Sequence, residues 1–185
     1  MRSPAGGAHD SEEQLRRLYT LHGRPVLAYA LRRTSSAEDA ADIVAETFLV
    51  AWRRLDSVPS DDPLPWLYGV ARRVLANQRR ATHRRIRLAE RLRQELPAAI
   101  QASDPPVTST GPVMAALRRL SADDQEVLLL TAWEQLEPNE IAEVLGVSRI
   151  AARSRLHRAR RRLADRAAED AEHSPTTTLR IEEAR

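Results

Sequence analysis

The stretch between Pro97 and Pro112 is the sequence feature that most constrains the fold of this chain. It holds four prolines among serines and threonines and shows no apolar periodicity, so it cannot continue a helix. The segments on either side carry apolar residues at helical spacing. The sequence therefore predicts two small helical domains, residues 11–95 and 113–168, joined by a flexible linker over residues 96–112.

Composition favours an all-α fold class. Aromatic residues make up 4% of the 185 residues, and alanine and leucine dominate, which disfavours a β-sandwich. The chain has no cysteine, so disulfides, thiolate metal sites and cysteine nucleophiles are excluded. No apolar run approaches the ~18 residues of a membrane span, and no secretion signal opens the chain. We expect a cytoplasmic protein without membrane insertion, with a loose leader at residues 1–10 and an acidic, disordered tail at residues 169–185.

The basic residues are all arginine, and they gather in two blocks. Residues 63–93 carry nine arginines against Glu90, and residues 146–166 carry eight against Asp165, whereas the segment between them is acidic. A codon bias toward GC-rich triplets explains the absence of lysine but not the clustering. Because the planar guanidinium donates paired hydrogen bonds to phosphate and guanine, the two blocks predict contact with nucleic acid.

The second domain carries a helix-turn-helix pattern. Ala142 is small where two helices would cross, Gly146 stands where a helix ends in a left-handed turn, and Ser148 can cap the next helix. One face of that next helix is basic, which predicts a recognition helix; a solvated helix face is the alternative. We expect bases to be read by Arg153, Ser154, His157 and Arg158, and phosphate to be bound by Arg149 and Arg161.

The first domain shows two candidate binding features. Acidic residues recur every four positions on a predicted helix: Glu38, Asp42 and Glu46, with Asp39 beside them. This acidic stripe predicts a docking face for a basic partner, with plain solvation as the alternative. The loop 56–65, followed by Trp66 and an arginine-rich helix, is typical of single-stranded DNA binding, in which arginines hold the backbone of a flipped base. For Trp66 alone, core packing is the simpler interpretation.

Four segments, in this order, resemble regions two and four of bacterial RNA polymerase sigma factors of the extracytoplasmic-function (ECF) group. They are AEDAADIVAETFLVAWRRL (37–55), PWLYGVARRVLANQRR (65–80), LSADDQEVLLL (120–130) and EIAEVLGVSRIAARSRLHRARRRL (140–163). The resemblance covers about residues 12–166. It implies a transcription initiation factor that is not an enzyme and that needs no cofactor or metal.

The resemblance also implies a role for each candidate residue. Region two would dock on the clamp helices of the largest subunit of core RNA polymerase, with the flap as a further contact, and would recognise and melt the −10 promoter element. Region four would read the −35 element of promoter DNA through the six residues of the basic helix, and an anti-sigma factor is the expected regulator. The implied polymerase contacts are Asp39, Asp42, Glu46, Phe48 and Trp52, and the implied −10 contacts are Trp66, Arg72, Arg73, Arg79 and Arg80.

Two other classes of function are disfavoured by the sequence. An enzyme would need a site, but the five histidines have no metal-ligand spacing and the six glycines form no phosphate-binding pattern. A stand-alone helix-turn-helix regulator would carry an upstream domain with a parallel sheet, and residues 11–95 show no strand pattern. Such a regulator binds promoter duplex tightly by itself, whereas a sigma factor needs the polymerase.

Overall fold

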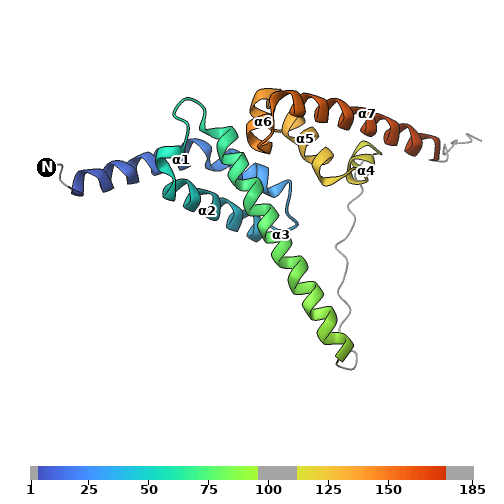
Figure 1. The fold of residues 1–185 in the computed structure, drawn as a ribbon, viewed down its shortest axis with the longest axis horizontal. Helices are drawn as coiled ribbons and strands as arrows, with labels where there is room; N and C mark the ends of the chain where they lie inside the picture. Colours follow the sequence, from blue (N-terminus) through green and yellow to red (C-terminus); the bar gives the residue numbers. More distant parts are fainter. Residues whose placement is uncertain (1–3, 96–111, 174–185) are drawn as a thin grey trace, which may run out of the picture.

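The computed structural model describes residues 4–95 and 112–173, and the regular elements of that part of the chain are all helices. The first domain contains α1 (Pro4–Leu31), α2 (Ala37–Arg53), a short 3-10 turn (Leu55–Ser57) and α3 (Pro63–Glu95), and the second contains α4 (Pro112–Arg118), α5 (Ala122–Ala132), α6 (Pro138–Leu145) and α7 (Arg149–His173) (Figure 1). The all-α class with two helical domains is confirmed. Apart from Pro112, the predicted linker lies outside the described residues, as does the predicted tail beyond His173.

The first domain is a three-helix unit in which α1, α2 and α3 all contact one another. Helix α2 is capped by Ser36, whose hydroxyl accepts a hydrogen bond from the Asp39 backbone N–H at 3.0 Å. Ile43 and Ala51 of α2 face the core and are fully buried, as is Leu67 of α3. The outer side of α2 is exposed, and so are most of residues 79–89 of α3. The C-terminal half of α3 extends away from the other helices (Figure 1).

Helix α1 differs from the expectation at both its beginning and its middle. Residues 4–10 are helical rather than a loose leader, since Pro4 occupies the first turn, where its missing N–H costs no hydrogen bond. The helix also passes through Pro25, although proline favours the first turn of a helix over its interior. Leu15 and Leu18 before the proline, and Tyr29 after it, belong to one packed face, and this packing offsets the backbone hydrogen bond that Pro25 cannot donate.

The second domain is built around α7, which packs on α4, α5 and α6. Helix α6 ends at Gly146, whose φ of 66° lies in the left-handed region, and Ser148 accepts a hydrogen bond from the Ala151 N–H at 3.2 Å at the start of α7. The helix-turn-helix is therefore present as predicted. Helix α7 continues to His173 although the tail was expected from residue 169, and an ion pair of 3.1 Å between Arg166 and Glu169 spans that junction.

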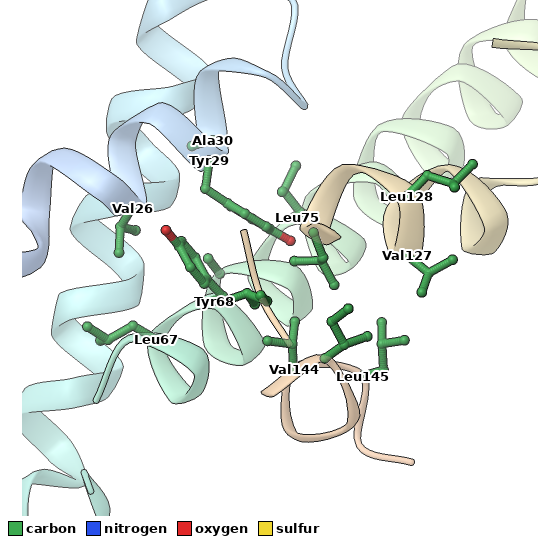
Figure 2. Close-up of a cluster of buried hydrophobic side chains, with 14 of the residues drawn as sticks. Val26, Tyr29, Ala30, Leu67, Tyr68, Leu75, Val127, Leu128, Val144 and Leu145 are labelled. Carbon is green, nitrogen blue, oxygen red and sulfur yellow. The ribbon is translucent and has the colours of Figure 1, made fainter. Parts of the chain in front are cut away.

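The two domains pack directly against each other, a contact that the sequence patterns do not predict. Helix α3 lies on α6, and the position of a Cβ on buried Gly69 would be 3.5 Å from the carbonyl oxygen of Val144. Tyr29 and Tyr68 stack with their ring centroids 5.1 Å apart, and Figure 2 shows both rings beside Val144 and Leu145 of α6. A single cluster of buried side chains thus runs through both domains.

Candidate nucleic-acid and protein interfaces

An exposed strip on α2 carries three of the five predicted polymerase contacts. Asp42 and Glu46 lie one helical turn apart with both side chains in solvent. Trp52, which is 39% exposed, and Leu49 continue the strip toward the end of α2. Acidic and apolar groups thus stand side by side, an arrangement that complements a partner surface with basic and apolar side chains.

The other two predicted polymerase contacts are placed differently. Phe48 is only 6% exposed and packs edge-on against Tyr19, with the ring centroids 5.0 Å apart, so it belongs to the core and its assignment as a contact is corrected. Asp39 accepts a hydrogen bond of 3.3 Å from the Gln78 side chain and so ties α2 to α3. Leu49 takes the place of Phe48 on the exposed strip, which we call the α2 strip: Asp42, Glu46, Leu49 and Trp52.

A groove of about 980 Å³ lies between α2 and α3. Asp42 and Glu46 line its α2 side, and Arg73 and Arg84 line its α3 side. Trp66 also lines the groove, and part of its side chain packs against the core, as the simpler interpretation expects. The groove therefore brings together the acidic strip and the basic helix, two features that are more than 20 residues apart in the sequence.

The predicted −10 contacts fall into two rows on α3. Trp66, Arg73 and Arg80 recur every seven residues and share one row, and Arg80 donates a hydrogen bond to the Asn77 side chain. Arg72 and Arg79 form a neighbouring row that is already engaged within the protein. Arg72 pairs with Asp123 of the second domain at 3.4 Å, and Arg79 donates to the Arg33 carbonyl at 3.0 Å. In the first row, Arg73 lines the groove and is exposed.

All six predicted −35 contacts are exposed on one side of α7. Four of them line a shallow depression in the N-terminal half of the helix: Arg153, Ser154, His157 and Arg158. Arg149 precedes and Arg161 follows this depression, and both are exposed. The opposite side of α7 is buried through Ala152, Leu156 and Ala159. The depression thus has the position and the donors of a base-reading surface.

The sequence reasoning missed Ile150 on this same face. The side chain of Ile150 is 80% exposed at the first turn of α7, four residues before Ser154 and seven before His157, so it stands at the head of their row. An exposed apolar group among donors is able to contact the methyl group of a thymine. The helical period alone would have placed Ile150 on the exposed face, but its apolar character made it resemble a core residue.

The sequence reasoning also missed a buried ion cluster between the domains. The Glu126 carboxylate accepts hydrogen bonds from the Tyr29 hydroxyl at 2.8 Å and from Arg33 Nε at 2.9 Å. Glu134 accepts from Arg32 at 2.7 Å and from Arg33 at 3.1 Å. The Arg33 guanidinium also lies 3.6 Å from the centre of the Tyr29 ring. We call these five residues the interdomain cluster.

Burial sets the protonation of the interdomain cluster and its neighbours. Desolvation, followed by the charge of Glu126, raises the pKa of Tyr29 well above its usual value, so the phenol remains a neutral donor. Desolvation likewise raises the pKa of Tyr68 to about 12. Burial alone would lower the pKa of Arg33, but Tyr29, Glu126 and Glu134 raise it overall. The cluster therefore holds two arginines against two glutamates, and Arg33 is the more deeply buried of the two cations.

Across residues 4–95 and 112–173, no group of three or more histidine, aspartate or glutamate side chains is placed to hold a metal ion. Over the same residues, no helix combines the length and apolar character that a membrane crossing requires.

The chain matches two family patterns and several named relatives. The Sigma-70 region 2 family matches residues 18–85, and the family described as Sigma-70, region 4 matches residues 110–163. The ECF RNA polymerase sigma factor SigL of Mycobacterium tuberculosis is 31% identical over 171 residues, which is 86% of this chain and 92% of SigL. The RNA polymerase sigma factor NccH of Alcaligenes xylosoxydans xylosoxydans is 33% identical over 158 residues, covering 77% of this chain and 80% of NccH.

Solved structures agree with these matches. CnrH, solved in complex with the cytosolic domain of CnrY, is 28% identical with a TM-score of 0.57, over 85% of this chain and 88% of CnrH. The sigma factor RpoE of Bartonella quintana, solved with the anti-sigma factor NepR, shares the fold at 24% identity and a TM-score of 0.61, over 83% of this chain and 96% of RpoE. With both sigma domains in order and relatives that match along most of their length, this chain belongs to the ECF sigma factors of bacterial RNA polymerase, regulators of transcription initiation rather than catalysts.

Proposed function

We propose that this sigma factor binds core RNA polymerase through the α2 strip and directs it to promoters whose −10 and −35 elements are contacted by α3 and α7. The observation that carries the proposal is the placement of exposed arginines on two separate helices, one in each domain. Arg73 of α3 and Arg153 of α7 are exposed, so their charges are not needed to stabilise the fold. Two basic faces in two domains fit two separate promoter elements.

The groove beside α3 supports a role at the −10 element. A melted strand needs cations along its phosphates and an apolar or aromatic surface for an unstacked base. Arg73 and Arg84 supply the charge on the α3 wall, and Trp66 supplies an aromatic surface in the same groove. The acids on the other wall would repel phosphate, which favours a path of the strand along α3 and leaves the α2 strip for the polymerase.

Helix α7 supports a role at the −35 element. A recognition helix reads base edges from its N-terminal half, and the depression of Arg153, Ser154, His157 and Arg158 lies there. Arg162 is not part of this surface, since it pairs with Asp124 of α5 at 2.6 Å and anchors the helix to its domain. Arg149, Arg153, Arg158 and Arg161 are exposed and have no such anchoring role, so they are available for DNA.

An anti-sigma factor is part of the same proposal. CnrH, which is 28% identical to this chain, was solved with the cytosolic domain of CnrY bound, and we extend that kind of partner to this protein. A cover over the α2 strip would prevent polymerase binding. The proposed function places the protein with the polymerase in the cytoplasm and uses no cofactor.

Run-off transcription tests the proposal. Purified core polymerase is incubated with genomic fragments, with and without the full-length protein, and transcripts are sequenced from their 5′ ends. We expect new transcripts only in the presence of both components, starting downstream of a shared pair of sequence elements. Tight binding of promoter duplex by the protein alone, together with no new transcript, would instead favour the stand-alone regulator.

A further inference from the structure

We propose that Ile150 is a specificity-determining residue of the second domain, whose side chain contacts the C5-methyl group of a thymine in the −35 element. This assignment rests on the proposed function and deepens it, because it adds an apolar contact with one kind of base to the hydrogen-bond donors of α7. Ile150 stands in the first turn of α7 and is 80% exposed, more than any other large apolar side chain of the described residues.

Ile150 projects from the side of α7 that faces away from its own domain. It lies nine residues before Ala159, and at about 100° per residue the two side chains leave the helix about 180° apart. Ala159 is fully buried, and Ala152, two residues after Ile150, is also buried. The same period places Ile150 in one row with Ser154 and His157, which line the depression of α7. Ile150 therefore belongs to the middle of the surface proposed to meet DNA and not to its edge.

The fold gives Ile150 no packing role. Its side chain belongs neither to the cluster of buried residues nor to the partly buried side chains packed against that cluster. A β-branched residue also loses side-chain freedom in a helix, so isoleucine stabilises α7 less than alanine would. Single exposed apolar residues are common on protein surfaces. The indication of a ligand is therefore the position of Ile150, in one row with polar side chains on a basic helix that follows a helix-turn-helix.

Thymine is the base that an isoleucine side chain distinguishes best. In the major groove, thymine alone among the four bases presents a methyl group, and contact between two apolar groups removes both from water. Isoleucine offers no hydrogen bond, so it leaves the donors and acceptors of other bases without a partner. Arg153 lies three residues after Ile150, about 4.5 Å along the helix axis, and one base-pair step is about 3.4 Å. We therefore expect the thymine one or two base pairs from the base that Arg153 contacts.

Replacing thymine with deoxyuridine in the promoter tests the contact at the level of one methyl group. Deoxyuridine keeps the base pairing and the O4 acceptor of thymine and lacks only the C5-methyl group. The −35 element is located from the run-off transcripts, and each of its thymines, on both strands, is then replaced in turn. Holoenzyme assembled from core polymerase and the full-length protein is titrated onto each duplex. We expect one replacement to weaken binding about three- to fivefold, the effect of one methyl group that is no longer buried.

Variants of Ile150 complete a double-mutant cycle with the same duplexes. Ile150→Ala keeps α7 intact, because the residue is exposed and alanine favours helix, and circular dichroism verifies this. We expect Ile150→Ala to bind the thymine and deoxyuridine duplexes equally, and Ile150→Val to retain part of the difference. The matched control is Val113→Ala, which shortens another exposed apolar side chain at the second position of a helix in the same domain. It should keep the full wild-type ratio.

The ratio of affinities for the thymine and deoxyuridine duplexes decides the outcome. If Ile150→Ala keeps the wild-type ratio, another residue contacts the methyl group and the inference is overturned. A −35 element in which no thymine methyl group affects wild-type binding overturns it as well, and so does a loss in Ile150→Ala that is equal on all duplexes, which would indicate a structural role or a protein partner. If wild-type protein gives no core-dependent transcripts, the proposed function fails before any base is replaced, and the inference fails with it.

Discussion

Replacing Gly146 with alanine tests the physical basis of the helix-turn-helix. Gly146 ends α6 at φ 66° and ψ 39°, and the next residue, Val147, donates to the Ala142 carbonyl at 3.0 Å to close the turn. No atom lies within 4 Å of the position that a Cβ would take, so the substitution creates no clash. The whole cost is conformational, because a Cβ disfavours the left-handed region by about 1–2 kcal/mol.

Asparagine is the matched variant at this position. Its side chain adds more atoms than alanine but tolerates the left-handed conformation better, through local hydrogen bonds. If conformation alone sets the cost, Gly146→Asn destabilises the protein less than Gly146→Ala, although it is the larger change. Steric reasoning predicts the opposite order, so the two variants separate the two explanations.

Urea unfolding, followed by the helical signal in circular dichroism, measures the effect. We expect the free energy of unfolding to fall by about 1–2 kcal/mol in Gly146→Ala and by less than half of that in Gly146→Asn. Gly69→Ala is the control, since Gly69 lies inside α3 and alanine favours helix there. Equal losses for alanine and asparagine, or no loss for alanine, would refute the argument that this turn requires a left-handed residue.

Three further predictions concern the binding surfaces. The double variant Asp42→Arg and Glu46→Arg should no longer co-purify with core polymerase, because it reverses the charge of the α2 strip. Arg73→Ala should weaken open-complex formation, and one lost contact with a single strand should reduce the slope of log affinity against log salt by about 0.7. Arg153→Ala should relax the preference at one −35 base at a cost of about 1–3 kcal/mol, whereas Arg161→Ala should weaken transcription from all sequences of a randomised −35 library alike.

Each of these predictions has a control in the same protein. Glu12→Arg reverses an exposed charge of α1 outside the α2 strip and should leave polymerase binding intact, so equal losses in both proteins would argue against a specific strip. Arg24→Ala removes an exposed arginine of α1 and should leave the salt slope unchanged. If Arg153→Ala lowers transcription uniformly and keeps the wild-type base preference, Arg153 does not read a base.

Local chemistry explains which parts of the fold could be predicted from the sequence. The turn at Gly146 and the caps at Ser121 and Ser148 depend on residues a few positions apart, and all three are present. The buried stripe of α7 follows from helical period alone. Pro25 shows the limit of the same reasoning, because packing on both sides of the proline outweighs its local preference.

Tertiary packing explains what the sequence could not provide. Phe48 is adjacent to exposed Leu49 and was assigned to a partner through family resemblance, yet it packs on Tyr19 of α1. The period of a helix shows that two faces differ but does not identify the neighbour that covers each face. The interdomain cluster is the extreme case, since Arg33 and Glu126 are 93 residues apart in the chain and no local pattern joins them.

The alternation of acidic and basic blocks, which in the sequence indicates only where DNA binds, is also an internal charge match. Asp124 pairs with Arg162 and fixes α7 on α5, while Asp123 pairs with Arg72 of the first domain. Arg72 therefore cannot keep its acid partner and contact the −10 element at once. A separation of the domains would break this pair, and it would add a cation to the surface of α3 that we propose for the −10 element. Phosphate contacts of Arg72 and the separated arrangement would then stabilise each other.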